Sequence, residues 1–103
     1  EDLSKLKQAK VKLTYKMRED NNNYFVDITL RNTSSQIAFF NQLQFLNSMM
    51  SPIRPSFYTD NFFSLMPGEK KTVTIETAKG KLKNGAVLVL KGWNIKRQEY
   101  KLK

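Results

Sequence analysis

The sequence predicts an all-β domain, an antiparallel β-sandwich of six to seven strands. Polar and apolar side chains alternate in segment after segment, which is typical of strands with one buried face. Clusters of Asn, Asp, Ser, Pro and Gly separate these segments at intervals of about 8–12 residues. No stretch shows the period of about 3.6 residues that an amphipathic helix requires. Together, these observations favour hairpin-connected strands that pack as two layers.

Six segments carry the strand pattern: residues 9–17, 24–31, 37–46, 70–77, 86–93 and, more weakly, 95–103. The first two alternate apolar residues with polar or charged ones, so each predicts a strand buried on one face. In the third segment one face holds Ile37, Phe39, Asn41, Leu43 and Phe45, and apolar residues on the other face (Ala38, Phe40 and Leu46) predict partial cover on both sides. The fifth segment is the most strongly apolar, and the last fits either a final edge strand or a frayed tail.

Turn-forming residues separate the predicted strands. Residues 18–23 form a polar turn with three consecutive Asn, and residues 32–35 form a second turn that contains an Asn-x-Ser glycosylation acceptor. Residues 47–55 hold two Pro, which cannot donate to a ladder, so this stretch predicts a loop or an edge. Pro67-Gly68 and Asn84-Gly85 are dipeptides that favour tight turns.

One segment between the strands is rich in large apolar side chains. Residues 57–69, which we call the aromatic segment, hold four rings within seven positions: Phe57, Tyr58, Phe62 and Phe63. Such a segment must cap the end of the core or press on another surface, because so much apolar area is costly to leave in water. We favour core and domain contacts over a stacking platform for sugars or bases, because Phe is a poorer sugar platform than Trp or Tyr.

Three further residues are candidates for the same surface. Asp60 and Asn61 lie inside the aromatic segment, and we expect their side chains to bind turn amides rather than a ligand. Trp93 lies late in the fifth predicted strand beside Gly92, where we expect core packing or an interface contact rather than ligand stacking. The candidate domain interface or sugar rim therefore consists of Phe57, Tyr58, Asp60, Asn61, Phe63 and Trp93.

The chain of 103 residues is long enough for one hydrophobic core. We expect residues 1–8 to be a polar lead-in and residues 9–103 to form a single domain. An immunoglobulin-like sandwich accounts for the strand number and spacing, although the cysteine pair of antibody domains is missing. A small barrel of the OB type is the alternative. Because the chain starts with Glu1 and shows no signal peptide, we expect it to be part of a longer polypeptide or to have lost its leader. No apolar run is long enough to cross a membrane.

The composition excludes several kinds of chemistry. The chain has no Cys and no His, which rules out disulfides, thiol nucleophiles, imidazole bases and the usual zinc sites. No glycine-rich phosphate loop is present, so we expect no cofactor and no metal. Most of the acidic residues fall in turns or on outward strand positions. Asp60 and Glu69, which lie within the aromatic segment, offer one conceivable carboxylate pair for glycoside cleavage, but the turn already explains Glu69.

The chain is strongly basic, with 18 Lys and Arg against nine Asp and Glu and a formal net charge of +9. Such an excess attracts polyanions, including nucleic acids. Lysines nevertheless outnumber arginines 14 to 4 and alternate evenly with apolar residues, a pattern typical of a solvated surface that protects strand edges. We therefore expect no nucleic-acid partner.

Four sequence blocks stand out together: Asn-Thr-Ser-Ser-Gln-Ile-Ala-Phe-Phe at 32–40, Asp-Asn-Phe-Phe-Ser-Leu-Met-Pro-Gly-Glu at 60–69, Thr-Val-Thr-Ile at 72–75 and Lys-Gly-Trp-Asn at 91–94. In this order they resemble the C-terminal immunoglobulin-like domain of family 2 glycoside hydrolases. The resemblance is greatest to the branch of β-mannosidases and exo-β-glucosaminidases, which includes mannosylglycoprotein endo-β-mannosidase. It covers residues 11–94 of the chain.

The resemblance implies an accessory role. In such enzymes the catalytic glutamates lie on a (β/α)8 barrel, and no acidic residue of this chain matches them, so the chain itself would be catalytically silent. It would pack on and stabilise the other domains of a periplasmic or extracellular hydrolase that removes terminal β-glycosides. A carbohydrate-binding module using the aromatic segment is an alternative function, and a basic nucleic-acid binder is a less favoured one. The exposed aromatics would also permit a dimer.

Overall fold

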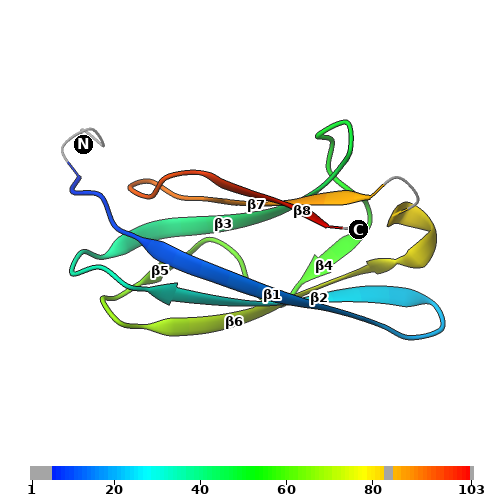
Figure 1. Cartoon of the computed structure of the whole chain (residues 1–103), viewed down its shortest axis with the longest axis horizontal. Coiled ribbons are helices and arrows are strands. Elements are labelled where there is room, and N and C mark those ends of the chain that lie inside the picture. The colour runs from blue at the N-terminus through cyan, green and yellow to red at the C-terminus, as the bar shows by residue number, and fades with distance from the viewer. Residues whose placement is uncertain (1–5, 83–84, 103) are drawn as a thin grey trace.

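The structure of the chain is a computed structural model that describes residues 6–82 and 85–102. Two four-stranded antiparallel sheets pack face to face (Figure 1), one with the strand order β1-β2-β6-β4 and the other with the order β5-β3-β7-β8. The strands are β1 (Val11–Glu19), β2 (Asn23–Asn32), β3 (Ala38–Asn47), β4 (Ser56–Tyr58), β5 (Phe63–Leu65), β6 (Lys70–Ala78), β7 (Ala86–Lys91) and β8 (Gln98–Leu102). A short 3-10 helix, η2 (Lys79–Leu82), precedes β7. The predicted antiparallel sandwich is confirmed. Within the described residues, no helix has the length and hydropathy needed to span a membrane.

The core lies between the inner faces of the two sheets. Its largest fully buried side chains come from both layers: Ile28, Leu30, Val73 and Ile75 from the first sheet, and Leu43, Phe45, Leu65, Leu88 and Leu90 from the second. In β2 and β6 the buried residues occupy alternate positions, as the sequence predicts. Full burial of one such side chain contributes about 1.5–3 kcal/mol, so these strands supply most of the apolar stabilisation.

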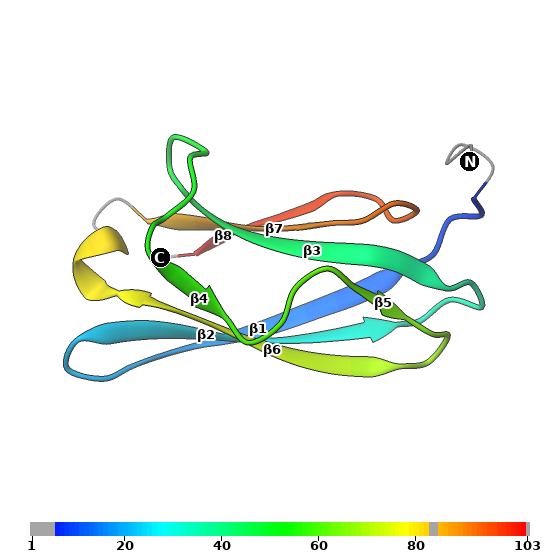
Figure 2. The same cartoon turned by 180° about the vertical axis from the view of Figure 1, so that it is seen from behind.

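The structure has eight strands rather than six or seven, because the aromatic segment contributes to both sheets. β4 begins one residue before the aromatic segment and pairs with β6 at the edge of the first sheet. The chain then crosses the open side of the sandwich, and β5 pairs with β3 at the edge of the second sheet. Figure 2 shows this crossing, in green, between the two layers. Strands of three residues are too short to show the alternation by which longer strands are recognised.

The alternation predicted for the third strand is wrong at its start, although the predicted cover of its second face is confirmed by the buried Ala38 and Leu46. Ala38 is fully buried, whereas Ile37 and Phe39 are only partly buried and Phe40 is exposed. The cause is a β-bulge, because Ala38 pairs with Leu65 and Asn41 pairs with Phe63, which leaves one extra residue on β3. Beyond the bulge, the predicted inward residues Asn41, Leu43 and Phe45 are all buried.

The C-terminal strands also differ from their predicted limits. β7 ends at Lys91, so Trp93 lies beyond the strand rather than inside it. The weak final segment forms β8, an edge strand that pairs with β7 along its whole length, and not a frayed tail. Of the predicted lead-in, residues 1–5 lie outside the described residues, and the predicted Asn84-Gly85 turn lies partly outside them.

Candidate interaction surface

The aromatic segment divides its rings between the core and the surface. Tyr58 and Phe63 pack against the core, whereas Phe57 and Phe62 are 65% and 63% exposed. The Tyr58 hydroxyl accepts a hydrogen bond from the Phe45 backbone N–H at 2.8 Å, and burial raises the pKa of this hydroxyl. Two rings therefore close the core, and two remain available for contacts.

Asn61 seals the edge of β3 beyond the point where β5 pairs with it. Its Oδ1 accepts a hydrogen bond from the Leu43 N–H at 2.8 Å, and its Nδ2 donates to the Leu43 carbonyl at 3.0 Å. The side chain thus takes the place of a neighbouring strand. Asn61 also accepts a bond from the Phe62 N–H at 3.1 Å, which is a turn bond of the predicted kind. The bonds to Leu43 were not predicted, because sequence alone does not show which backbone lies opposite a loop.

Asp60 and Glu69 each have a structural partner. Asp60 accepts a bond from the Asn61 N–H at 2.8 Å and forms an ion pair with Lys71 at 2.5 Å, which lowers the pKa of Asp60. Glu69 accepts a bond from the Met66 N–H at 2.8 Å. Each carboxylate is thus engaged in local structure rather than with the other.

Exposed aromatic rings gather at one corner of the second sheet. Phe40 and Trp93 are 45% and 49% exposed, and their ring centroids lie 4.4 Å apart. The Phe40 N–H donates to the Ser64 Oγ of β5 at 3.0 Å, which ties this corner to the edge strand. We call Phe40 and Trp93 the aromatic corner.

The backbone adopts an uncommon conformation at Phe40 in the aromatic corner and at Phe62 in the aromatic segment. The φ angle is 48° at Phe40 and 57° at Phe62. A positive φ costs a residue with a side chain about 1–2 kcal/mol, because Cβ approaches the following carbonyl. Strain of this kind at residues that expose apolar rings is typical of a contact surface.

Gly92 allows the chain beneath the corner to approach β3 closely. A Cβ atom at this position would lie 3.1 Å from the Phe39 carbonyl oxygen, from Asn41 Oδ1 and from Ile95 Cγ1. Contacts this short require the neighbouring atoms to move, and the Phe39 oxygen belongs to the backbone. The glycine therefore keeps β7 and β3 close together next to Trp93.

We expect Gly92→Ala to lower the free energy of unfolding by about 1–3 kcal/mol, the usual cost of overpacking. Urea denaturation of the 103-residue chain measures this change. Gly80→Ala is the matched control, because a Cβ at Gly80 meets nothing within 4 Å. A Gly92 variant as stable as the Gly80 variant would contradict the close approach.

Asn94 ties the corner to the start of β3 and to the N-terminal segment. The side chain is 2% exposed, and its Oδ1 accepts a bond from the Phe39 N–H at 2.9 Å. Its Nδ2 donates to the carbonyl oxygens of Lys7 and Ile37 at 2.9 Å and 2.7 Å. Its own carbonyl accepts a bond from the Ala9 N–H at 2.8 Å. One side chain thus holds three chain segments together at this end of the sandwich.

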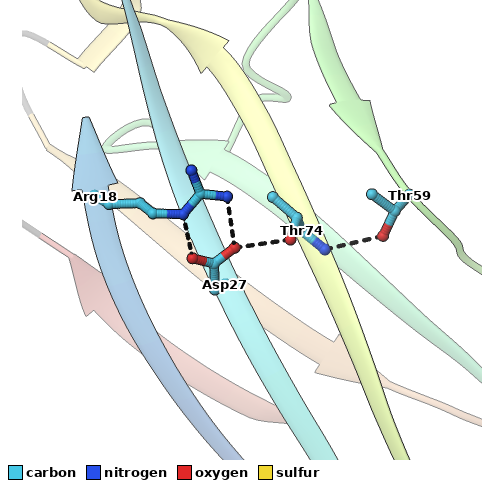
Figure 3. A network of polar contacts seen from close by, with 4 residues as sticks. All are labelled: Arg18, Asp27, Thr59 and Thr74. Atoms are coloured by element: carbon cyan, nitrogen blue, oxygen red, sulfur yellow. Dashed lines mark hydrogen bonds and ion pairs between the residues drawn. The ribbon is translucent and has the colours of Figure 1, made fainter. Parts of the chain in front are cut away.

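A polar network crosses the outer face of the first sheet (Figure 3). Arg18 of β1 donates to both carboxylate oxygens of Asp27 on β2, at 2.5 Å and 3.1 Å. Thr74 of β6 donates its hydroxyl to Asp27 at 2.8 Å, and its N–H donates to the Thr59 hydroxyl at 2.9 Å. The bonds from Arg18 and Thr74 to the charged carboxylate lower the pKa of Asp27.

The lowered pKa of Asp27 predicts a dependence of stability on pH. A carboxyl with a folded-state pKa below its unfolded value stabilises the fold above that unfolded value, about 3.9, and loses this contribution as the pH falls through the folded pKa. We expect Asp27→Asn to flatten the fall in melting temperature between about pH 5 and about pH 2. The pKa values of Asp20 and Asp60 are lowered too, so part of the slope remains. A melting temperature that falls with pH as steeply in the variant as in the unaltered chain would contradict the role of Asp27.

The six candidate residues from the sequence do not form one patch. Phe57 pairs with Glu76 on the first sheet, and Trp93 belongs to the aromatic corner of the second. Tyr58 and Phe63 close the core, Asn61 covers the edge of β3, and Asp60 pairs with Lys71. Sequence reasoning missed Phe40 as a surface residue, although two adjacent Phe inside an alternating strand signal a break in the pattern. Residues 6–82 and 85–102 contain no group of three or more Asp, Glu, His or Cys side chains placed to hold a metal.

Comparisons with known proteins agree with this fold. The family model described as the exo-β-D-glucosaminidase Ig-fold domain matches residues 1–95. The crystal structure of the exo-chitosanase CsxA of Amycolatopsis orientalis superposes with a TM-score of 0.87 at 28% sequence identity, covering 96% of this chain and 12% of that enzyme's chain. A variant of CsxA in complex with PNP-β-D-glucosamine gives a TM-score of 0.87 at 27% identity, with the same coverage. No curated protein sequence matches the chain.

The two packed sheets and the match to one small part of a solved exo-chitosanase define an immunoglobulin-like sandwich domain of the kind found in glycoside hydrolases. This chain spans 12% of the length of the enzyme that it matches. It belongs to the exo-β-D-glucosaminidase Ig-fold domain family. The resemblance to family 2 glycoside hydrolases found in the sequence is confirmed. Within the predicted branch of β-mannosidases and exo-β-glucosaminidases, the matches name glucosaminidase and exo-chitosanase and do not support β-mannosidase.

Proposed function

We propose that this chain is the non-catalytic accessory sandwich of an exo-acting β-glucosaminidase, and that it packs on the catalytic part and stabilises it. The observation that carries the proposal is the match of nearly the whole chain to a domain that makes up 12% of an exo-chitosanase. The engagement of Asp60 and Glu69 in separate structural contacts supports the non-catalytic role. The matched family is described as a glucosaminidase domain, and the matched enzyme was solved with PNP-β-D-glucosamine. Both support terminal β-linked glucosamine as the substrate class of the parent.

The aromatic corner is the contact surface that we propose for this packing. Phe40 and Trp93 present two touching rings on a backbone held in place by Gly92 and Asn94. Large aromatic side chains that become buried at an interface are the usual binding hot spots, and truncation of one typically costs about 2 kcal/mol or more. In the separate domain, the same rings are half exposed and contribute little to folding.

The experiment compares the parent hydrolase with and without this domain. We expect removal of the domain to lower the thermal stability of the parent, and we expect the purified 103-residue chain to release no p-nitrophenol from PNP-β-D-glucosamine. Turnover by the purified chain would overturn the non-catalytic role. A parent that is equally stable without the domain would overturn the stabilising role.

The double variant Phe40→Ala/Trp93→Ala tests the surface itself. We expect it to destabilise the parent more than it destabilises the separate chain, because the interface contact is lost only in the parent. Phe57→Ala is the matched control, since Phe57 is 65% exposed but lies on the other sheet. Equal effects of the corner variant on the parent and on the separate chain would exclude the corner as the contact.

A further inference from the structure

Three cationic side chains form a row across neighbouring strands on the outer face of the first sheet. Lys12 of β1 lies opposite Arg31 of β2, and Arg31 lies opposite Lys70 of β6. Directly opposite residues of antiparallel strands point to the same face, and all three residues are exposed. With adjacent strands about 4.8 Å apart, the row is about 10 Å long. We call Lys12, Arg31 and Lys70 the cation row.

The cation row is unfavourable for the separate domain. Like charges directly opposite each other in a sheet destabilise it. Protection of a strand edge accounts for Lys12, because β1 is an edge strand. It also accounts for Lys70, because β4 pairs only with residues 75–77 of β6 and leaves the Lys70 end of β6 unpaired on that side. It does not account for Arg31, because β2 is paired on both sides at this position. Arg31, at the centre of the row, therefore calls for a reason outside the folding of this sheet.

The acidic residues of the described chain do not neutralise the cation row. Of the nine acidic residues, Glu1 and Asp2 lie outside the described part, which leaves seven. Each of the seven accepts hydrogen bonds or forms an ion pair elsewhere: Glu19 with Lys79, Asp20 with the amides of Asn22 and Asn23, Asp27 with Arg18, Asp60 with Lys71, Glu69 with Met66, Glu76 with Asn23, and Glu99 with Arg97. Within residues 6–82 and 85–102, none of Lys12, Arg31 and Lys70 forms an ion pair with a carboxylate.

A surface depression lies beside the row. Its volume is about 430 Å³, and Lys12 and Arg31 line it together with Thr33, Ser34 and Gly68. Asn32 lies at its base, and this side chain is fully buried and bonded to Ser34 and to the carbonyls of Gln36 and Leu65. No carboxylate lines the depression. An incoming carboxylate would therefore meet two cations and nearby hydroxyl groups.

We propose that the cation row docks an acidic surface of another part of the parent hydrolase, whose carboxylates lie over Lys12, Arg31 and Lys70. The proposal rests on the proposed function, in which the domain packs on a much larger chain. A protein surface is favoured over a nucleic acid because two of the three cations are Lys, which lacks the bidentate fork of Arg. No aromatic ring lines the row or the depression, so unpaired bases would find no stacking partner there.

The test compares the same substitution in the separate chain and in the parent. The variant is Lys12→Gln/Arg31→Gln/Lys70→Gln, and the control is Lys81→Gln/Lys96→Gln/Lys101→Gln, which removes three exposed positive charges elsewhere. We expect the row variant to melt at the same or a higher temperature than the unaltered separate chain, because like-charge repulsion is relieved. In the parent, we expect the row variant to lower the melting temperature by about 2–4 °C at about 50 mM salt, and this difference to shrink at about 500 mM salt.

Each outcome has a defined meaning. Opposite signs in the separate chain and in the parent, with an unaffected control, support the docking surface. Equal melting of the row variant and the control in the parent would overturn it, while the proposed function would still stand if removal of the domain destabilises the parent. If removal of the domain leaves the melting temperature of the parent unchanged, both the docking surface and the proposed function are overturned. Binding of a single-stranded oligonucleotide that the row variant loses, with unchanged melting of the parent, would overturn the protein partner in favour of nucleic acid.

Discussion

Replacing Phe45 by Ala is expected to lower the free energy of unfolding by about 4 kcal/mol. Phe45 is 1% exposed and heads the largest fully buried side chains of the core. It points between the two sheets from β3, where it pairs with Leu88 of β7, itself fully buried. Removal of the ring forfeits its transfer free energy and leaves a cavity that the surrounding strands fill only in part.

The measurement is urea denaturation of the chain, with an unchanged slope showing that the unfolded state is not altered. Phe62→Ala is the matched control, because the same atoms are removed from a ring that is 63% exposed. We expect the control to change the free energy of unfolding by less than about 0.5 kcal/mol. Similar losses for the two variants would contradict the assignment of Phe45 to the core and of Phe62 to the surface.

Replacing Asn94 by Ala has the second-largest expected effect, a loss of about 3 kcal/mol of unfolding free energy. The substitution leaves the Phe39 N–H and the carbonyls of Lys7 and Ile37 without the partner that now joins them. Leaving one buried polar group unsatisfied costs about 1–3 kcal/mol. The effect extends beyond one turn, because the N-terminal segment and the start of β3 both lose an anchor.

Asn47→Ala provides the comparison for Asn94. The Asn47 side chain accepts bonds from the Met49 and Ser51 N–H groups at 2.9 Å and 3.0 Å, but both bonds lie in an exposed turn, where water can replace them. We therefore expect a loss of about 1 kcal/mol or less in this variant. If Asn94→Ala is no more costly than Asn47→Ala, its bonds do not hold the three segments together.

The asparagines within the family-like blocks hold the structure at one end of the sandwich. Asn32 bonds across to Leu65, Asn61 bonds to β3, and Asn94 joins β3 to the N-terminal segment. Their partners are mostly backbone groups, and backbone groups exist at every position whatever the sequence. The blocks were recognisable from the sequence, but the task of each Asn was not, because the partners that join separate chain segments lie between 18 and 87 residues away along the chain.

The amino-acid sequence by itself determined the fold class of this protein and the positions of its long strands. Alternation along β2 and β6 shows which side chains face inward, because a strand turns successive residues to opposite faces and only one face meets the core. The family blocks within residues 32–94 likewise pointed to a domain of a glycoside hydrolase, which the family match confirms. Both inferences rest on local sequence patterns, which can be recognised without knowledge of the fold.

Only the tertiary structure decided which surfaces the protein offers. The bulge near Phe40 brings its ring against Trp93, and the crossing of the aromatic segment separates Phe57 from the aromatic corner. The cation row exists because the register brings Lys12, Arg31 and Lys70 side by side. The physical reason is the same in each case. An exposed surface is assembled from strands that are neighbours in space, and the pairing that makes them neighbours depends on the free energy of the whole fold.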